Sequence, residues 1–194
     1  ANGNDTLSID ISDNGNNGAD PSSVGQAGTG TGSDETASST VTLNRQAVND
    51  APTANVPGLQ SVTGGTKTAI PGLSIGDIDS ATGDLTVTLT TTTGTFDVNP
   101  AGLDSVSGQD SKTLTLTGTV AELNTALGTV NFTPPPGDVD ITADVTLSVN
   151  DQGNTGVDPS TVGQPATGNA TSEEASSSFK INISDVNDAP TVNT

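Results

Sequence analysis

The strongest constraint on this chain is an internal repeat. Residues 13–56 align without a gap on residues 151–194 at a constant offset of 138 positions, and 24 of the 44 aligned pairs are identical. The block Val48-Asn49-Asp50-Ala51-Pro52-Thr53 returns at 186–191. Because equivalent sequences build equivalent elements, both copies are expected to fold alike and to contact mainly their neighbours along the chain.

The repeat also predicts where the units begin and end. One complete unit runs from one Val-Asn-Asp-Ala-Pro block to the next, at 48–188. Residues 1–47 are then the C-terminal third of a preceding unit, and residues 189–194 begin the next linker. We interpret the chain as a piece of a tandem array whose first partners are the neighbouring repeats of the same chain.

Apolar residues alternate with threonine, serine and other polar residues, which is the pattern of strands that bury one face. The alternating residues are Leu7, Ile9 and Ile11, Leu85, Val87 and Leu89, Leu114 and Leu116, Val130 and Phe132, Val145, Leu147 and Val149, and Phe179, Ile181 and Ile183. Residues 120–127 have apolar side chains near helical spacing and predict one short helix. Several short strands separated by Gly and Pro turns predict an all-β fold, an antiparallel β-sandwich.

The composition excludes most catalytic chemistry. The chain has no His and no Cys, so it offers no imidazole base and no thiol nucleophile, and we predict that it is not an enzyme. Its 23 acidic and 4 basic residues give a net charge of −19, which should repel nucleic acid and anionic lipid. No apolar run is long enough to cross a bilayer, so no membrane insertion is expected.

The acidic residues gather at particular positions. Asp77 and Asp79 alternate along backbone that is expected to be extended, so both carboxylates should point the same way. Carboxylate and amide oxygens are the ligands that hard cations such as Ca²⁺ prefer. The other candidates are Asn49 and Asp50 at the first boundary, Asp13, Asp20, Asp151 and Asp158 in the loops after the penultimate strands, and Asp185, Asn187 and Asp188 at the second boundary. Two other interpretations stay open, since turn Asp and Asn bond their own backbone and surface acids favour solubility.

These blocks resemble those of a known family. Asp185-Val186-Asn187-Asp188-Ala189-Pro190 resembles the linker motif of cadherin-like repeats, and Asp77-Ile78-Asp79 resembles their Asp-x-Asp element. The unit 48–188 is similar to the cadherin-like, Ig-like extender repeats of giant bacterial repeats-in-toxin adhesins. The resemblance implies a β-sandwich in tandem repeat, secreted to the bacterial cell surface, whose junctions are stiffened by Ca²⁺ and whose role in cell adhesion is structural.

The resemblance also implies a set of calcium ligands. Asn49 and Asp50 would act with Asp77 and Asp79 at the junction inside this chain, with acids of the preceding loop nearby. The equivalent ligands at the second boundary would bind an ion together with a following unit, and they are Asp185, Asn187 and Asp188. Two departures from the family pattern predict fewer or weaker ions at the internal junction: Ala47 stands where the second copy has Asp185, and Gly64-Gly65 stand where the family commonly has an acid.

Two alternatives of other classes remain. Thr-rich strand faces are also compatible with a ligand-binding adhesin module for a glycan or an ice surface. Residues 1–47 carry two strands whose sheet partners lie outside that segment, and such exposed edges favour a self-assembling extracellular filament in which other copies of the chain exchange strands.

Overall fold

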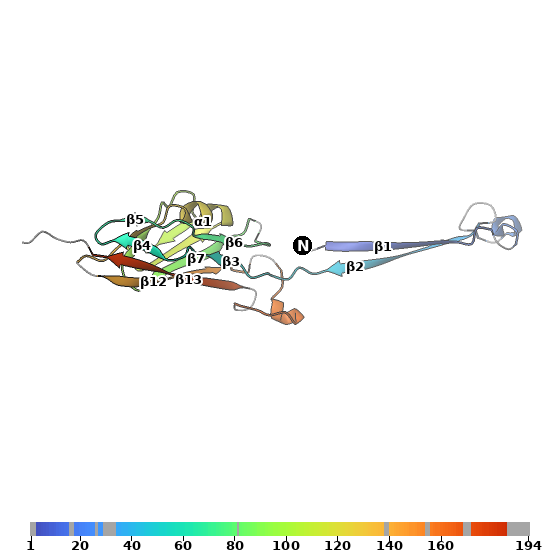
Figure 1. The fold of residues 1–194 in the computed structure, drawn as a ribbon. Helices are drawn as coiled ribbons and strands as arrows, with labels where there is room; N and C mark the ends of the chain where they lie inside the picture. Colours follow the sequence, from blue (N-terminus) through green and yellow to red (C-terminus); the bar gives the residue numbers. More distant parts are fainter. Residues whose placement is uncertain are drawn as a thin grey trace, which may run out of the picture. The chain divides into compact units, whose positions relative to one another are not determined.

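The computed structural model describes residues 3–15, 18–25, 27–28, 34–80, 82–137, 140–153, 156–168 and 172–185. The chain divides into two compact units, Ala1–Ala47 and Val48–Thr194, called unit 1 and unit 2 below. Strands make up 47% of the residues and helices 9%, and the strands form several antiparallel sheets, so the predicted all-β sandwich class is confirmed (Figure 1). No helix of the described residues is long and apolar enough to span a membrane.

The described residues of unit 2 form three sheets. The largest has six strands in the order β4-β13-β12-β7-β10-β9, and only the β13–β4 pair is parallel. The smaller sheets have the orders β5-β11-β8 and β3-β6. The strands are β3 (Thr53–Asn55), β4 (Gln60–Thr63), β5 (Thr68–Ala69), β6 (Ser74–Gly76), β7 (Leu85–Thr91), β8 (Thr95–Asp97), β9 (Ser105–Ser107), β10 (Thr113–Gly118), β11 (Asn131–Thr133), β12 (Ile141–Asn150) and β13 (Glu174–Ser184). Of these, β7, β10, β11, β12 and β13 follow the alternation seen in the sequence.

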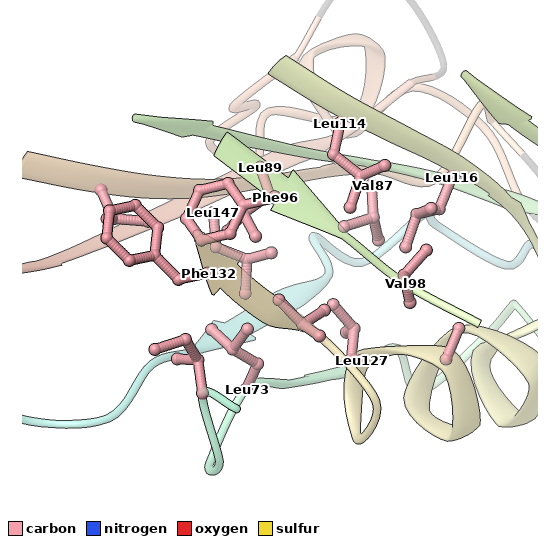
Figure 2. Close-up of a cluster of buried hydrophobic side chains, with 14 of the residues drawn as sticks. Leu73, Val87, Leu89, Phe96, Val98, Leu114, Leu116, Leu127, Phe132 and Leu147 are labelled. Carbon is pink, nitrogen blue, oxygen red and sulfur yellow. The ribbon is translucent and has the colours of Figure 1, made fainter. Parts of the chain in front are cut away.

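The period-two pattern places one face of the large sheet in the core. Along β7 every second residue is buried, beginning with Leu85, and the intervening threonines are partly exposed. Phe96 and Phe132, both fully buried, pack against each other with ring centroids 5.4 Å apart. Figure 2 shows these two rings among Leu89, Leu147 and other aliphatic side chains from both layers. This burial of apolar area is the main force that holds the sandwich together.

The predicted helix is confirmed at Val120–Leu127 (α1). It begins with a capping box, because Thr119 and Glu122 satisfy each other's backbone N–H groups. Its Asn124 side chain bonds both the N–H and the carbonyl of Ile75, each at 2.9 Å. The helix therefore holds β6 in place, and β6 leads directly into the acidic segment at 77–79.

Unit 1 is a two-stranded antiparallel ribbon of β1 (Gly3–Ser12) and β2 (Thr36–Arg45), with a 3-10 turn η1 (Pro21–Val24) in the connecting loop. Its register pairs Leu7 with Val41, and at an offset of 138 residues β12 pairs Val145 with Phe179. In unit 2 the corresponding face is covered by core. In unit 1 the large apolar side chains on this face are 46–65% exposed, and they are Leu7, Ile9, Ile11, Val41 and Leu43.

Replacing Phe132 by Ala is expected to lower the free energy of unfolding of unit 2 by about 3–5 kcal/mol, because it opens a cavity in a fully buried aromatic pair. Urea unfolding followed by far-UV circular dichroism measures this change. Leu7→Ala is the control: Leu7 is 51% exposed, so its loss should cost less than about 1 kcal/mol. Equal effects of the two substitutions would contradict the core assignment.

Candidate functional site

The acidic segment after β6 folds into a tight bend. The Asp77 carboxylate accepts the N–H groups of Asp79 and Ser80 at 3.0 Å each through Oδ1. The sequence-based prediction of extended backbone here is wrong, because these two side-chain-to-backbone bonds curl the chain. The two carboxylates are nevertheless neighbours, since the Asp77 side chain contributes to the raised pKa of Asp79.

Asp79 connects this bend to the first boundary block. Its Oδ2 accepts the backbone N–H of Asp50 at 2.9 Å. Burial raises the pKa of Asp79 to about 6, and the negative charges of Asp77 and Asp50 add to the rise, while the Asp50 N–H opposes it. The ionised form of Asp79 is therefore poorly stabilised by the protein itself.

Two buried oxygens in this bend have no donor. Among the described residues, neither Asp77 Oδ2 nor Asp79 Oδ1 has a hydrogen-bond partner. Two ionised carboxylates cannot bond each other, because both are only acceptors. A shared proton or a cation between them would satisfy both oxygens, and these are the atoms that fit Ca²⁺.

Asn49 lies at the same end of unit 2 and is 2% exposed. Its backbone N–H donates to the Val157 carbonyl at 3.1 Å, and its side-chain amide donates to Asp151 Oδ2. Val48 pairs with Val157 in a parallel bridge. Gly156 permits this close approach: its φ is +102°, and a Cβ there would lie 2.6 Å from the Asn49 nitrogen.

Sequence reasoning missed Glu173. This residue is 1% exposed, and its backbone N–H donates to Asp151 Oδ1 at 2.8 Å while its carbonyl accepts the Asp151 N–H at 3.1 Å. The signal was present, because Glu35 and Glu173 are one of the identical pairs of the repeat. The pair Glu173-Glu174 at the start of a Ser-rich strand gave no pattern of its own.

The loop of unit 1 has the same local arrangement. The Asp13 N–H donates to the Glu35 carbonyl at 3.1 Å, as the Asp151 N–H does to Glu173, and Asp13 Oδ1 accepts the N–H groups of Gly15 and Glu35 at 2.9 Å each. These backbone donors lower the pKa of Asp13 below its usual value. Asp20 and Glu35 both lie near Gly28, where a Cβ would be 3.9 Å and 3.3 Å from their carboxylate oxygens.

The remaining predicted ligands are apart from this cluster or serve the backbone. Asp158 caps the 3-10 turn η2 (Pro159–Val162), accepting the Ser160 N–H at 2.8 Å, as expected for a turn Asp. Asp185 is exposed at the other end of the β12–β13 ladder, where its N–H donates to Asp140 Oδ1 at 2.8 Å. Asn187 and Asp188 lie outside the described residues.

Gly64 also lies at that far end, because its N–H donates to the Ser184 carbonyl at 2.8 Å. The missing acid at Gly64-Gly65 therefore concerns the segment after β13 and not the Asn49 and Asp50 cluster. This placement corrects the expectation that both departures weaken one junction. The contribution of Gly64 to a site depends on where the strand ends meet, which the spacing along the sequence does not give.

The cluster at the start of unit 2 is incomplete as a metal centre by itself. Within the described part of the chain, no group of three or more acidic side chains is close enough to hold a metal ion. Ca²⁺ takes six to eight oxygens, including backbone carbonyls and water, so two or three carboxylates can suffice for a weak site. A hollow of about 480 Å³ beside Asn49 and Asp50, lined also by Pro159 and Pro165, admits solvent to this end.

No protein-family model, no curated protein and no solved structure matches this chain.

In EDTA, the raised pKa of Asp79 predicts a specific pH dependence. The folded state holds this proton up to about pH 6 and the unfolded chain only up to 3.8, so this contribution to stability falls as the pH rises between these values. Asp79→Asn keeps an acceptor for the Asp50 N–H but cannot ionise. Relative to the wild type, its melting temperature should rise by about 3 °C from pH 4 to pH 7, corresponding to about 1 kcal/mol after solvent screening. A constant difference would contradict the raised pKa.

Proposed function

We propose that this chain is a structural, non-catalytic extender from a bacterial surface adhesin and that Ca²⁺ stiffens it at the start of unit 2. The observation that carries the proposal is the pair of buried carboxylate oxygens without donors on Asp77 and Asp79. The Asp79 side chain also accepts the Asp50 N–H through its other oxygen. These groups belong to the boundary block and to the first acidic bend, as the family resemblance implies.

The physical role of the ion follows from these contacts. Without a cation, ionised Asp50, Asp77 and Asp79 repel one another, as the raised pKa of Asp79 indicates. A bound ion would replace repulsion by shared attraction and would fix the backbone at 49–50, directly after the last residue of unit 1. Since backbone freedom is lost on binding, the linker would become a stiff part of the array.

The proposed location is the extracellular face of a bacterial cell. Extracellular modules bind calcium with dissociation constants of about 10⁻⁴–10⁻³ M, so a weak site of this kind suits that location. The net charge of −19 favours such an ion over anionic partners. The proposed partners are neighbouring repeats of the same chain.

Calcium at ten times its dissociation constant is expected to add about 1.4 kcal/mol of stability to the folded state, which raises the melting temperature by about 4 °C. Differential scanning calorimetry measures this shift, and small-angle scattering should show less bending of the particle. The double variant Asp77→Asn with Asp79→Asn should lose the part of the calcium-dependent gain that this site supplies, so its melting temperature should rise less in calcium than that of the wild type.

The matched control is Asp10→Asn, which removes an exposed carboxylate from β1 and should leave the calcium response unchanged. The proposal fails if the wild type melts at the same temperature in calcium and in EDTA, or if the control and the double variant respond alike.

A second candidate function is self-assembly through unit 1. The exposed apolar face of its ribbon favours this role, because a two-stranded ribbon alone is marginally stable in water. Ile9 is central on that face, while Ser8 lies on the opposite face of the same strand.

If the ribbon associates with other copies, sedimentation velocity should show oligomers that grow with concentration. Ile9→Asp should then give a monomer, whereas Ser8→Asp, which adds the same charge to the polar face, should not. A wild type that stays monomeric at all concentrations would rule out this candidate.

A further inference from the structure

The end of the β12–β13 ladder places two carboxylates where the core pattern calls for apolar residues. Val145, Leu147 and Val149 are the inward residues of β12, and the next inward position is Asp151. On the partner strand the corresponding position is Glu173, because the register that pairs Asn150 with Glu174 continues to this pair. The two acids are therefore opposite each other just beyond the ladder, joined by the Asp151 N–H bond to the Glu173 carbonyl and the Glu173 N–H bond to Asp151 Oδ1.

Both carboxylates are fully buried, at 0% exposure for Asp151 and 1% for Glu173. Glu173 Oε2 accepts the N–H of Thr167 at 2.5 Å and its hydroxyl at 2.8 Å. The other oxygen, Oε1, is buried without a hydrogen-bond partner among the described residues. An ionised oxygen in that position is strongly unfavourable unless a positive charge lies against it.

The chain supplies no such charge from its own basic residues, because all four have partners elsewhere. Arg45 pairs with Asp5, Lys67 with Asp97 and Lys180 with Asp144, and Lys112 donates to the Thr92 carbonyl. Like charges directly opposite in a ladder are also destabilising. None of these basic side chains therefore lies against Glu173 Oε1, and a cation from solution would compensate that oxygen.

We propose that unit 2 binds a hard divalent cation between Glu173 and Asp151, with Glu173 Oε1 as the anchoring ligand. The choice of Ca²⁺ as that cation rests on the proposed function, whereas the site itself does not. Its ligands differ from those of the Asp50, Asp77 and Asp79 cluster. Asn49, which bonds Asp151, would connect this ion to the boundary block.

Unit 1 provides a built-in comparison. Asp13 and Glu35 repeat the pairing of Asp151 and Glu173, but Asp13 is exposed and Glu35 is only partly buried. Solvated carboxylates need no added counter-charge, so this pair should bind a cation much more weakly.

Calorimetric titration of the full chain with Ca²⁺ tests the site with three variants. Glu173→Gln should weaken one binding event by about tenfold or more, because it removes a ligand charge. Glu35→Gln should leave that event unchanged, and so should the double variant Asp77→Asn with Asp79→Asn. In EDTA, Glu173→Gln should melt no lower than the wild type, since it removes an uncompensated charge, whereas a Glu with a purely structural role would lose stability.

Terbium-soaked crystals of the wild type give a second readout that does not depend on any variant folding. An anomalous peak is expected about 2.3–2.6 Å from Glu173 Oε1. Absence of that peak, or a Glu173→Gln titration identical to the wild type, would overturn the inference. If the double variant Asp77→Asn with Asp79→Asn instead gains as much stability in calcium as the wild type, the proposed function fails and the Glu173 site is unaffected.

Discussion

The β12–β13 ladder is the interaction on which the rest of unit 2 depends. Its ten paired positions set the two longest strands side by side, and their inward residues supply much of the core face. The same register carries on past the last apolar pair to Asp151 and Glu173, and Asp151 holds Asn49. Core packing and the polar end of the unit are therefore parts of one hydrogen-bonded element.

Charge balance is the second constraint. With 23 acidic and 4 basic residues, the chain cannot pair most of its carboxylates internally. On the surface this costs little, because water and salt screen the charges. At Asp79 and Glu173 burial removes that screening, and backbone donors reach only some of the oxygens. A bound cation would compensate the buried negative charge at each of these two residues, which lie at the same end of unit 2.

The repeated ribbon of β1 and β2 shows how much depends on context. It has the register and local bonds of β12 and β13, yet its apolar face is exposed and its Asp13 is solvated. Related local sequence with the same alternation is thus sufficient for the hairpin and its loop bonds. It is not sufficient for burial, which in unit 2 comes from strands and a helix that are far away in the sequence.

The sequence alone determined the strands with strict alternation, the helix at 120–127 and the grouping of acids near the boundary block, because these follow from local periodicity and composition. It did not determine the short strands β3, β5, β6, β8 and β9, whose few residues carry too little pattern. Only the tertiary structure decided that Asp77 and Asp79 sit in a bend, that Gly64 belongs to the far end and that Glu173 faces Asp151. Each of these depends on which strand ends meet, and that is a property of sheet pairing between distant segments.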